Sequence, residues 1–291
     1  MDRQTRPVID TTTSHPARRY NYLLGGKDNF QADRESGDQL ARLNPAIKIA
    51  ALENRAFLQR AVGFLAEQGI RQYVDIGTGL PTADNTHEVA QRVAPESRIV
   101  YVDNDPLVLV HARALLTSTP EGRTAYLEAD LREPEKILND PVLRETLDLT
   151  QPVGLVLVSV LPFLAGDDVA GPIVRTLLAA MPAGSYLVLS HATFDTLDPE
   201  VAAHYWEMFH AGKSDIWPRT EAEFRGLFAG LELVEPGVVQ VHEWRPRPDA
   251  TPRAANEINN WGAVGRKPQE QGPAAEAVQG DGGGGAGDGL E

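Results

Sequence analysis

The apolar residues of the chain form two kinds of pattern that alternate along it. Short runs rich in Val, Ile, Leu and Tyr are bounded by Gly, Pro, Asp or Asn, which is typical of strands buried in a sheet. These runs predict strands over 73–76, 99–103, 123–128, 153–163 and 184–190. The run over 153–163 is apolar almost throughout, which indicates a strand covered on both faces.

Between these runs, apolar residues recur at intervals of three and four, which predicts amphipathic helices. The predicted helices cover 18–24, a segment that begins near Asp33, 45–68, 85–93, 107–116, 133–147 with a break at Pro141, 169–181, 199–211, and a segment after Thr220. Strands that alternate with helices at this rhythm predict an α/β fold with a parallel sheet and right-handed crossovers.

The order changes after the fifth predicted strand. Two further strands are predicted over 231–241 and 261–265, joined by a loop rich in Pro and Arg. The polar residues 1–16 predict an extended arm, and the glycine-rich acidic segment from Pro268 onwards predicts disorder. The expected organisation is therefore an arm and helical cap over 1–70, a cofactor-binding domain over 71–267, and a tail over 268–291.

A glycine-rich turn follows the first predicted strand and carries the clearest chemical signal. Gly77 permits a tight turn, and Gly79 removes a side chain where a ligand must come close. The free N–H groups of the following helix can face that ligand. Asp103 ends the next strand, where an acidic residue accepts the ribose hydroxyls of a bound nucleoside. The pattern therefore predicts a nucleotide-binding corner.

Two features of this corner bear on which nucleotide it binds. Asp75 is predicted as an exposed carboxylate at the strand end, able to reach an ammonium group but repelling a pyrophosphate. Pro81 and Thr82 stand where the dinucleotide fingerprint has its third glycine. Both features disfavour NAD. They suit S-adenosylmethionine, which carries no phosphate and presents a sulfonium and an ammonium group.

Four more candidates follow from position at strand ends. Asp130 would receive the adenine amino group while the backbone N–H of Leu131 meets a ring nitrogen, although Asp130 alone is an ordinary strand-end residue. Ser159 lies at the carboxyl end of the fourth strand, and Asn104 directly follows Asp103. We include all four residues in the predicted cofactor site.

Two candidates come from segments before the first strand. Arg55 interrupts the apolar stripe of the helix over 45–68, so it lies either near the carboxylate of the cofactor or in solvent on the outer face. Tyr22 belongs to a loop segment with two aromatic residues, two glycines and an Asp-Asn pair. This loop either shapes the site or only anchors the arm to the domain.

Composition limits the class of the protein. The chain has 291 residues, 42% of them hydrophobic, which suffices for one large domain. Its net charge of −14 offers no overall attraction to nucleic acid or to an anionic membrane. It contains no cysteine, which removes disulfides, thiol catalysis and cysteine-based metal sites, and we predict no metal centre. No signal peptide or apolar span is evident, so a cytoplasmic location is expected.

With these residues in place, the chain resembles the class I, Rossmann-like methyltransferases that use S-adenosylmethionine. More narrowly, it resembles a bacterial family once classed as a domain of unknown function and since called S-adenosyl methyltransferase. The narrower likeness rests on Tyr22–Asn29 (YLLGGKDN), Glu53–Arg55 (ENR), Asp75–Pro81 (DIGTGLP), Tyr101–Pro106 (YVDNDP) and the closing Val264–Lys267 (VGRK). It covers almost everything except the arm and the tail.

The resemblance implies a doubly wound, mostly parallel seven-stranded sheet of order 3-2-1-4-5-7-6, with the last strand antiparallel and a helical extension at the amino terminus. It also implies that Asp75, Gly77 and Gly79 hold the methionine part of the cofactor, that Asp103 holds the ribose, and that Tyr22 and its loop cover the site. Many such enzymes carry a histidine after the fourth strand, where this chain has Pro162. His191 remains near the site, but a histidine at a strand end is more often structural, so we assign no catalytic residue.

Three functions stay open at this point. The first is a methyltransferase acting on a small-molecule acceptor, which the aromatic residues over 205–209 suggest, although helix packing explains them equally well. The second is a non-enzymatic protein that binds S-adenosylmethionine or its demethylated product as a signal, which Pro162 favours slightly. The third, an NAD-dependent oxidoreductase, is disfavoured by Asp75 and Pro81. The oligomeric state is not indicated.

Overall fold

The computed structural model describes residues 9–115 and 117–269. Its longer helices are α1 (Pro16–Leu23), α2 (Gln31–Leu43), α3 (Ile47–Glu67), α4 (Thr86–Val93), α5 (Pro106–Leu115), α8 (Ala170–Ala179) and α9 (Pro199–His210). Its shorter helices are α6 (Pro134–Asn139), α7 (Pro141–Thr146), α10 (Glu221–Gly226), η1 (Leu161–Phe163), η2 (Val241–Glu243) and η3 (Ala255–Glu257). The first eight residues of the predicted arm, the end of the helix predicted over 107–116, and the predicted disordered segment from residue 270 onwards lie outside the described residues.

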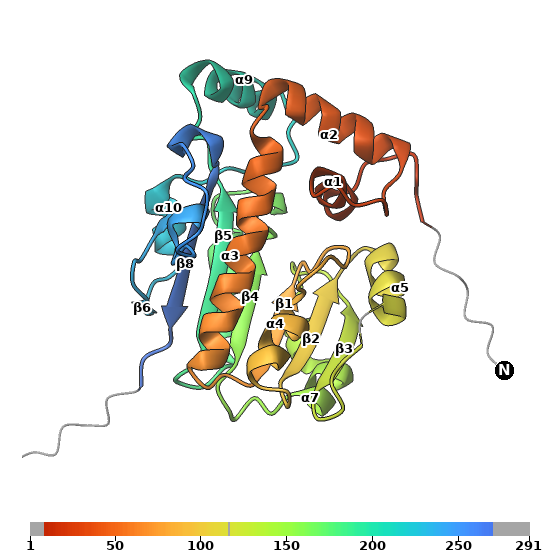
Figure 1. Ribbon diagram of the computed structural model, residues 1–291, viewed down its shortest axis with the longest axis vertical. Helices are drawn as coiled ribbons and strands as arrows, with labels where there is room; N and C mark the ends of the chain where they lie inside the picture. Colours follow the sequence, from red (N-terminus) through yellow and green to blue (C-terminus); the bar gives the residue numbers. More distant parts are fainter. Residues whose placement is uncertain (1–8, 116, 270–291) are drawn as a thin grey trace, which may run out of the picture.

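The strands form one mixed sheet (Figure 1). They are β1 (Gln72–Ile76), β2 (Arg98–Asp103), β3 (Arg123–Glu128), β4 (Gly154–Val158), β5 (Tyr186–Ala192), β6 (Glu232–Leu233), β7 (Val239–Gln240) and β8 (Asn260–Arg266). The order is β3-β2-β1-β4-β5-β8-β6, with β7 also paired to β8. The first five strands are parallel and β8 runs antiparallel to β5. The predicted order 3-2-1-4-5-7-6 is confirmed. The strand predicted as the seventh is labelled β8 because the sixth predicted strand is divided into β6 and β7.

Two predicted strands need correction. The strand expected over 231–241 is divided into β6 and β7 by a turn in which Gly237, at φ +85°, donates its N–H to Val234 O. Pro236 cannot donate to a ladder, which favours this break. The strand expected over 153–163 ends at Val158, because Ser159 takes φ +54° and the chain then enters η1. The first break leaves β6 and β7 as two separate short strands on β8, and the second takes the chain out of the sheet into η1.

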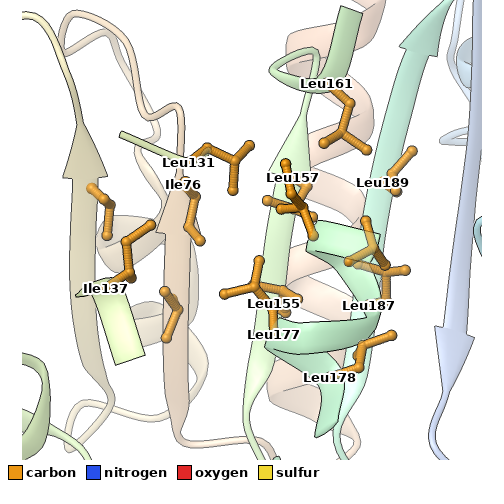
Figure 2. Close-up of a cluster of buried hydrophobic side chains, with 14 of the residues drawn as sticks. Ile76, Leu131, Ile137, Leu155, Leu157, Leu161, Leu177, Leu178, Leu187 and Leu189 are labelled. Atoms are coloured by element: carbon orange, nitrogen blue, oxygen red, sulfur yellow. The ribbon is translucent and has the colours of Figure 1, made fainter. Parts of the chain in front are cut away.

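The core lies on both faces of the sheet, as the alternation of side chains along each strand requires. On one face, β1, β4 and β5 contribute Val74, Ile76, Leu155, Leu157, Leu187 and Leu189, which pack with residues of α6, α7, α8 and α10. Figure 2 shows the side chains of this cluster from Ile76 on β1 to Leu189 on β5, with Ile137 of α6 and Leu177 of α8. On the other face, Tyr73, Val156 and Val188 pack against α3 and α4. The sheet is therefore doubly wound, as predicted.

Helix α3 supplies most of the cover on the second face. Its apolar stripe buries Phe57, Ala61 and Leu65 completely. The Phe57 ring meets the buried Trp244 edge to face, with ring centroids 5.6 Å apart. Burying a side chain of this size contributes about 1.5–3 kcal/mol. The helix runs along the strands and carries its amino-terminal half past their carboxyl ends (Figure 1).

The amino-terminal helices α1 and α2 lie beyond the carboxyl ends of the parallel strands (Figure 1). Buried Arg18 of α1 donates its Nε–H to Asp105 Oδ2 at 3.0 Å, next to the end of β2. Tyr20 donates its hydroxyl to Ala51 O of α3 at 2.9 Å. The predicted helical extension is thus present, and it covers the edge of the sheet where ligands bind in such folds.

Candidate functional site

A cavity of about 470 Å³ lies at the carboxyl ends of β1–β4, beneath α1 and α3. Nine of the ten predicted cofactor-site residues line it, namely Arg55, Asp75, Gly77, Gly79, Asp103, Asn104, Asp130, Leu131 and Ser159. They come from segments that are distant in sequence, and the parallel strands bring them to one edge. The remaining prediction, Tyr22, falls outside the lining.

The glycine corner has the backbone geometry that the sequence predicts. Gly77 has φ +74° and donates its N–H to Val102 O at 2.8 Å. A Cβ on Gly77 would overlap the side chain of Val160. Gly79 has φ +67°, and a Cβ there would meet nothing within 4 Å, so the space beside it is open. Gly77 is required by close packing, whereas Gly79 is required by its backbone angle alone.

Asp103 ties this corner to the end of β2. Its Oδ2 accepts the Gly79 N–H at 2.8 Å, and its Oδ1 accepts the Asp105 N–H at 2.9 Å. Burial raises the pKa of Asp103, whereas these two backbone donors oppose that rise. Each carboxylate oxygen keeps a second lone pair for a ligand hydroxyl. The carboxylate faces the corner, as a role in ribose binding requires.

Asp75 differs from its prediction. It is buried rather than exposed, with 4% of its surface accessible, and its Oδ2 accepts the Thr86 hydroxyl at 2.5 Å. Thr86 begins α4, so the start of this helix covers the carboxylate. Burial raises the pKa of Asp75 to about 6, against the opposing effects of the Thr86 hydrogen bond and the Arg55 charge. The sequence pattern located the residue but could not foresee this cover.

Arg55 reaches the cavity from α3 and does not lie on the outer face of the helix. Its Nη2 donates to Asp84 O at 3.1 Å and to Asn85 Oδ1 at 3.0 Å. Its Nε is buried and has no hydrogen-bond partner in the described part of the chain. The guanidinium therefore lines the cavity beside Asp75 with its buried Nε–H donor unused, which suits a ligand carboxylate.

The far end of the cavity is formed after β3. Asp130 accepts the Arg132 N–H on Oδ1 and pairs with the Arg132 guanidinium through Oδ2, each at 2.9 Å. Leu131 is buried in the main apolar cluster, which fixes the backbone at this point (Figure 2). Asn104 lines the same cavity and is exposed.

Tyr20, and not the predicted Tyr22, lines the cavity. The Tyr22 hydroxyl donates to Asp38 Oδ1 at 2.6 Å, and its ring packs against Gly37 of α2, so this side chain anchors the two helices. The Tyr20 hydroxyl accepts a hydrogen bond from Asn54 Nδ2 at 3.0 Å. Helical periodicity places residues two apart on different faces, so the choice between these tyrosines required the orientation of α1.

A chain of hydrogen bonds continues from Asn54 to the end of β4. Asn54 Oδ1 accepts the Ser190 hydroxyl at 2.6 Å, and Ser190 Oγ accepts the Ser159 N–H at 3.1 Å. These bonds hold Ser159 in its left-handed conformation at the cavity wall. Sequence reasoning found Ser159 but missed Asn54 and Ser190.

Other lining residues were also missed. His15 lines the cavity, and its Nδ1 lies 3.3 Å from Asp105 Oδ2. Asn259 and Asn260 line it because β8, being antiparallel, begins where β5 ends, and Asn260 pairs with Ala192. The predicted strand order contained this signal, since an antiparallel last strand brings its first residues to the site.

His191 is structural. It is completely buried and absent from the cavity lining. Its Nδ1 lies 2.8 Å from Ala192 O, so Nδ1 carries the proton, and its Nε2 accepts from Arg219 Nη1 at 2.6 Å. Desolvation, and after it the Arg219 charge, lower the pKa of His191 to about 3. A neutral, fully bonded imidazole cannot act as a general base here. Pro162, which does line the cavity, offers no titratable group.

Comparison with protein families identifies the kind of protein. A family model described as S-adenosyl methyltransferase matches residues 2–268. The chain belongs to the S-adenosyl methyltransferase family. The prediction of a methyltransferase that uses S-adenosylmethionine is thereby confirmed.

Solved structures of two relatives agree with this assignment. A DUF574 family protein from Streptomyces avermitilis MA-4680 is 49% identical, with a TM-score of 0.83, over 89% of this chain and 99% of that one. A candidate methyltransferase from Thermobifida fusca YX is 42% identical, with a TM-score of 0.81, over 89% of this chain and 97% of that one. No curated protein matches the chain.

Two further findings concern the described part of this chain. Over residues 9–115 and 117–269, no helix has the length and apolarity needed to cross a membrane. Within the same ranges, no group of three or more His, Asp or Glu side chains is arranged to hold a metal ion.

Proposed function

We propose that this S-adenosyl methyltransferase binds its cofactor along the carboxyl ends of β1–β3 and methylates a small molecule held between that site and the amino-terminal helices. The observation that carries the proposal is the corner where Asp103 holds the Gly79 N–H at 2.8 Å beside an open space. That corner lies in a cavity of about 470 Å³, within the usual size range of small-molecule sites.

The residues present fit S-adenosylmethionine part by part. Asp75 would hold the ammonium group, and the unused Nε–H of Arg55 would meet the carboxylate. The free lone pairs of Asp103 would accept the ribose hydroxyls. Asp130 and the backbone at Leu131 would meet the adenine ring. No phosphate has to be accommodated, which agrees with two buried carboxylates, Asp75 and Asp103, at one corner.

When bound, S-adenosylmethionine supplies an electrophilic methyl group on a positively charged sulfur. The task of the protein is then to align a nucleophile and to exclude water. The bonded series Tyr20, Asn54, Ser190 and Ser159 fixes one wall of the cavity. Arg18 of α1, bonded to Asp105, holds the cover over the ribose end. Because His191 is neutral and outside the cavity, we assign it no part in moving a proton.

The acceptor side of the cavity favours a small molecule over a nucleic acid. Its lining includes the apolar side chains Leu23, Ile47, Leu58, Phe163 and Leu164. The net charge of −14 opposes the approach of a polyanion. We therefore propose a small organic acceptor with an apolar part, and we keep the prediction of a cytoplasmic enzyme as part of this proposal.

The test is to incubate the full chain with methyl-labelled S-adenosylmethionine and separate fractions of a cell extract. We expect label in the small-molecule fraction only, and none with Asp103→Ala. Label in the nucleic-acid or protein fraction would contradict the proposed acceptor class. Tight cofactor binding without label in any fraction would contradict turnover of a small molecule by this site.

A further inference from the structure

A second cavity of about 260 Å³ adjoins the first. It lies between α2, α9 and the segment 213–216, at the end of the molecule where α2 and α9 meet (Figure 1). Arg19, Leu40, Asp215 and Ile216 line both cavities. The two spaces are therefore neighbours separated by these four side chains, and no residue assigned to the cofactor lines the second one.

An ion pair stands at the boundary between them. Arg19 Nη2 lies 2.6 Å from Asp215 Oδ2, and the Arg19 side chain is 9% exposed while that of Asp215 is 49% exposed. Arg19 also donates Nη1–H to Ser36 Oγ at 3.2 Å. The guanidinium is thus fixed in a buried position, whereas its carboxylate partner comes from an exposed segment and can be replaced by another anion.

Tyr205 supplies an independent observation in the second cavity. It lines the cavity, and its side chain is 97% buried, since only 3% of its surface is accessible. Its hydroxyl is buried without a hydrogen-bond partner among the described residues. Burial raises the pKa of Tyr205 to about 12, and the charge of Arg19 opposes that rise, so the phenol stays a donor next to a cation. A buried hydroxyl without a partner is unfavourable, and a ligand oxygen would satisfy it.

The charged groups around this hydroxyl are mostly basic. Arg19 and Lys213 line the second cavity, against one acidic residue, Asp215, and the imidazole of His204 lines it as well. This local excess of positive charge occurs in a chain with a net charge of −14. Leu40 and Ile216, which line both cavities, supply apolar surface between the basic side chains and the main cavity, and Met208 adds apolar surface to the second cavity.

We propose that the second cavity is a subsite for an anionic group, a carboxylate or a phosphate, at one end of the methyl acceptor. The Tyr205 hydroxyl and the Arg19 guanidinium bind that group after it displaces Asp215, and the apolar part of the acceptor passes Leu40 and Ile216 into the main cavity. This inference rests on the proposed function, because it names the class of acceptor for the same site.

Two substitutions should change anion binding in opposite directions. Tyr205→Phe removes the donor and keeps the ring, so it should weaken anion binding about tenfold, the effect of a hydrogen bond to a charged group. Asp215→Asn removes the competing carboxylate, so it should strengthen anion binding several-fold. If these residues had only a structural role, neither substitution would increase the affinity for anions. Tyr126→Phe is the matched control, because the Tyr126 hydroxyl bonds Thr124 Oγ1 in β3 at 3.4 Å.

The experiment uses the full chain saturated with S-adenosylhomocysteine and measures binding of small probes by ligand-observed NMR. The probes are phenylpropionate, phenyl phosphate, phenylpropionamide and phenylpropylamine. We expect the two anions to bind at least tenfold more tightly than the amide and the amine. The ratio of the affinities for phenylpropionate and phenyl phosphate distinguishes a carboxylate site from a phosphate site. Binding of the anions should weaken with Tyr205→Phe, strengthen with Asp215→Asn, and stay unchanged with Tyr126→Phe.

The inference is overturned if the amide or amine binds as tightly as the anions, if no probe binds, or if Asp215→Asn weakens anion binding. A separate titration with S-adenosylhomocysteine comes first. If the unmodified protein does not bind S-adenosylhomocysteine, the proposed function itself is wrong. If it binds S-adenosylhomocysteine but shows no preference for the anionic probes, only the proposed subsite is wrong.

Discussion

Asp75 carries the most informative chemistry at the scale of single residues. It is buried beside a second carboxylate, Asp103, and burial raises its pKa to about 6. A raised pKa means that the unbound protein resists ionising this group. A cationic ligand would reverse that effect, because its charge favours the carboxylate form. Asp75 is therefore suited to recognise an ammonium group, and its ionised form is unfavourable when no such group is bound.

This reasoning predicts a pH dependence of cofactor binding. Because the carboxylate must be ionised to bind an ammonium group, affinity for S-adenosylhomocysteine should fall below pH 6, by up to about tenfold per pH unit. The amino and carboxyl groups of the ligand keep their charges between pH 5 and 7. Calorimetry across this range measures the effect. Asp75→Asn should bind weakly and show a flat profile, and an unchanged slope in that variant would exclude Asp75 as its source.

Gly77 allows a second test at this scale. Gly77→Ala places a Cβ against Val160 at φ +74°, whereas Gly212→Ala meets nothing within 4 Å at φ +65°. Both variants carry the strain of a left-handed alanine, about 1–2 kcal/mol. Only the first adds a steric overlap beside the cofactor, so it should lower the free energy of unfolding further and weaken cofactor binding. Equal losses measured by urea denaturation would contradict this account of the corner.

The sequence predicts which residues line the cavity where the constraint is local. Gly77, Gly79 and Asp103 follow from a strand, a turn and the next strand end, and all three line the cavity. Asp75 also lines the cavity, but its burial depends on Thr86 of α4 and could not be inferred. The choice of Tyr20 over Tyr22 depends on how α1 is rotated against α3, which no local pattern encodes.

At the scale of elements, the first helix acts as a cover. Arg18 connects α1 to Asp105, and Asp105 in turn accepts the Leu107 N–H at the start of α5. The Arg18 guanidinium also lies over the Phe30 ring, 5.5 Å from its centroid. The cover is thus anchored directly to the turn that follows β2, at Asp105, two residues after the carboxylate assigned to the ribose.

Removing this anchor should loosen the cover without unfolding the sheet. Arg18→Met keeps a long side chain but loses the ion pair, so we expect several-fold weaker cofactor binding and faster proteolysis between α1 and α2. Arg34→Met is the control, because exposed Arg34 bonds, among residues 9–115 and 117–269, only Asn29 in the same extension. Equal protease sensitivity in the two variants would exclude Arg18 as the anchor.

Elements were predicted with unequal success. The long helix over 45–68 appears as α3, and the break at Pro141 divides α6 from α7, because periodicity and proline act locally. The run over 231–241 contains strand-forming residues, yet it forms only β6 and β7. Its pairing depends on β8, which lies far along the chain, and on a turn at Gly237.

At the scale of the whole molecule, the division at residue 70 remains a prediction. Helix α3 buries Phe57, Leu58 and Val62 against the sheet and so belongs to its core. We expect a chain starting at residue 71 to show no cooperative thermal unfolding, because one face of the sheet would be bare. A chain starting at Pro45 should unfold cooperatively but bind no cofactor, since it lacks α1. Cooperative unfolding of the shorter chain would place α3 outside the folding unit.

The central claim is that the corner made by β1 and β2 receives the adenosyl group of S-adenosylmethionine. The most direct measurement is calorimetric titration of S-adenosylhomocysteine into the full chain, into Asp103→Ala, and into the exposed control Asp168→Ala. We predict micromolar or tighter binding to the full chain and the control, and at least about a hundredfold weaker binding to Asp103→Ala, from two lost hydrogen bonds to a charged group. No binding at micromolar protein, or equal binding in all three, would contradict the claim.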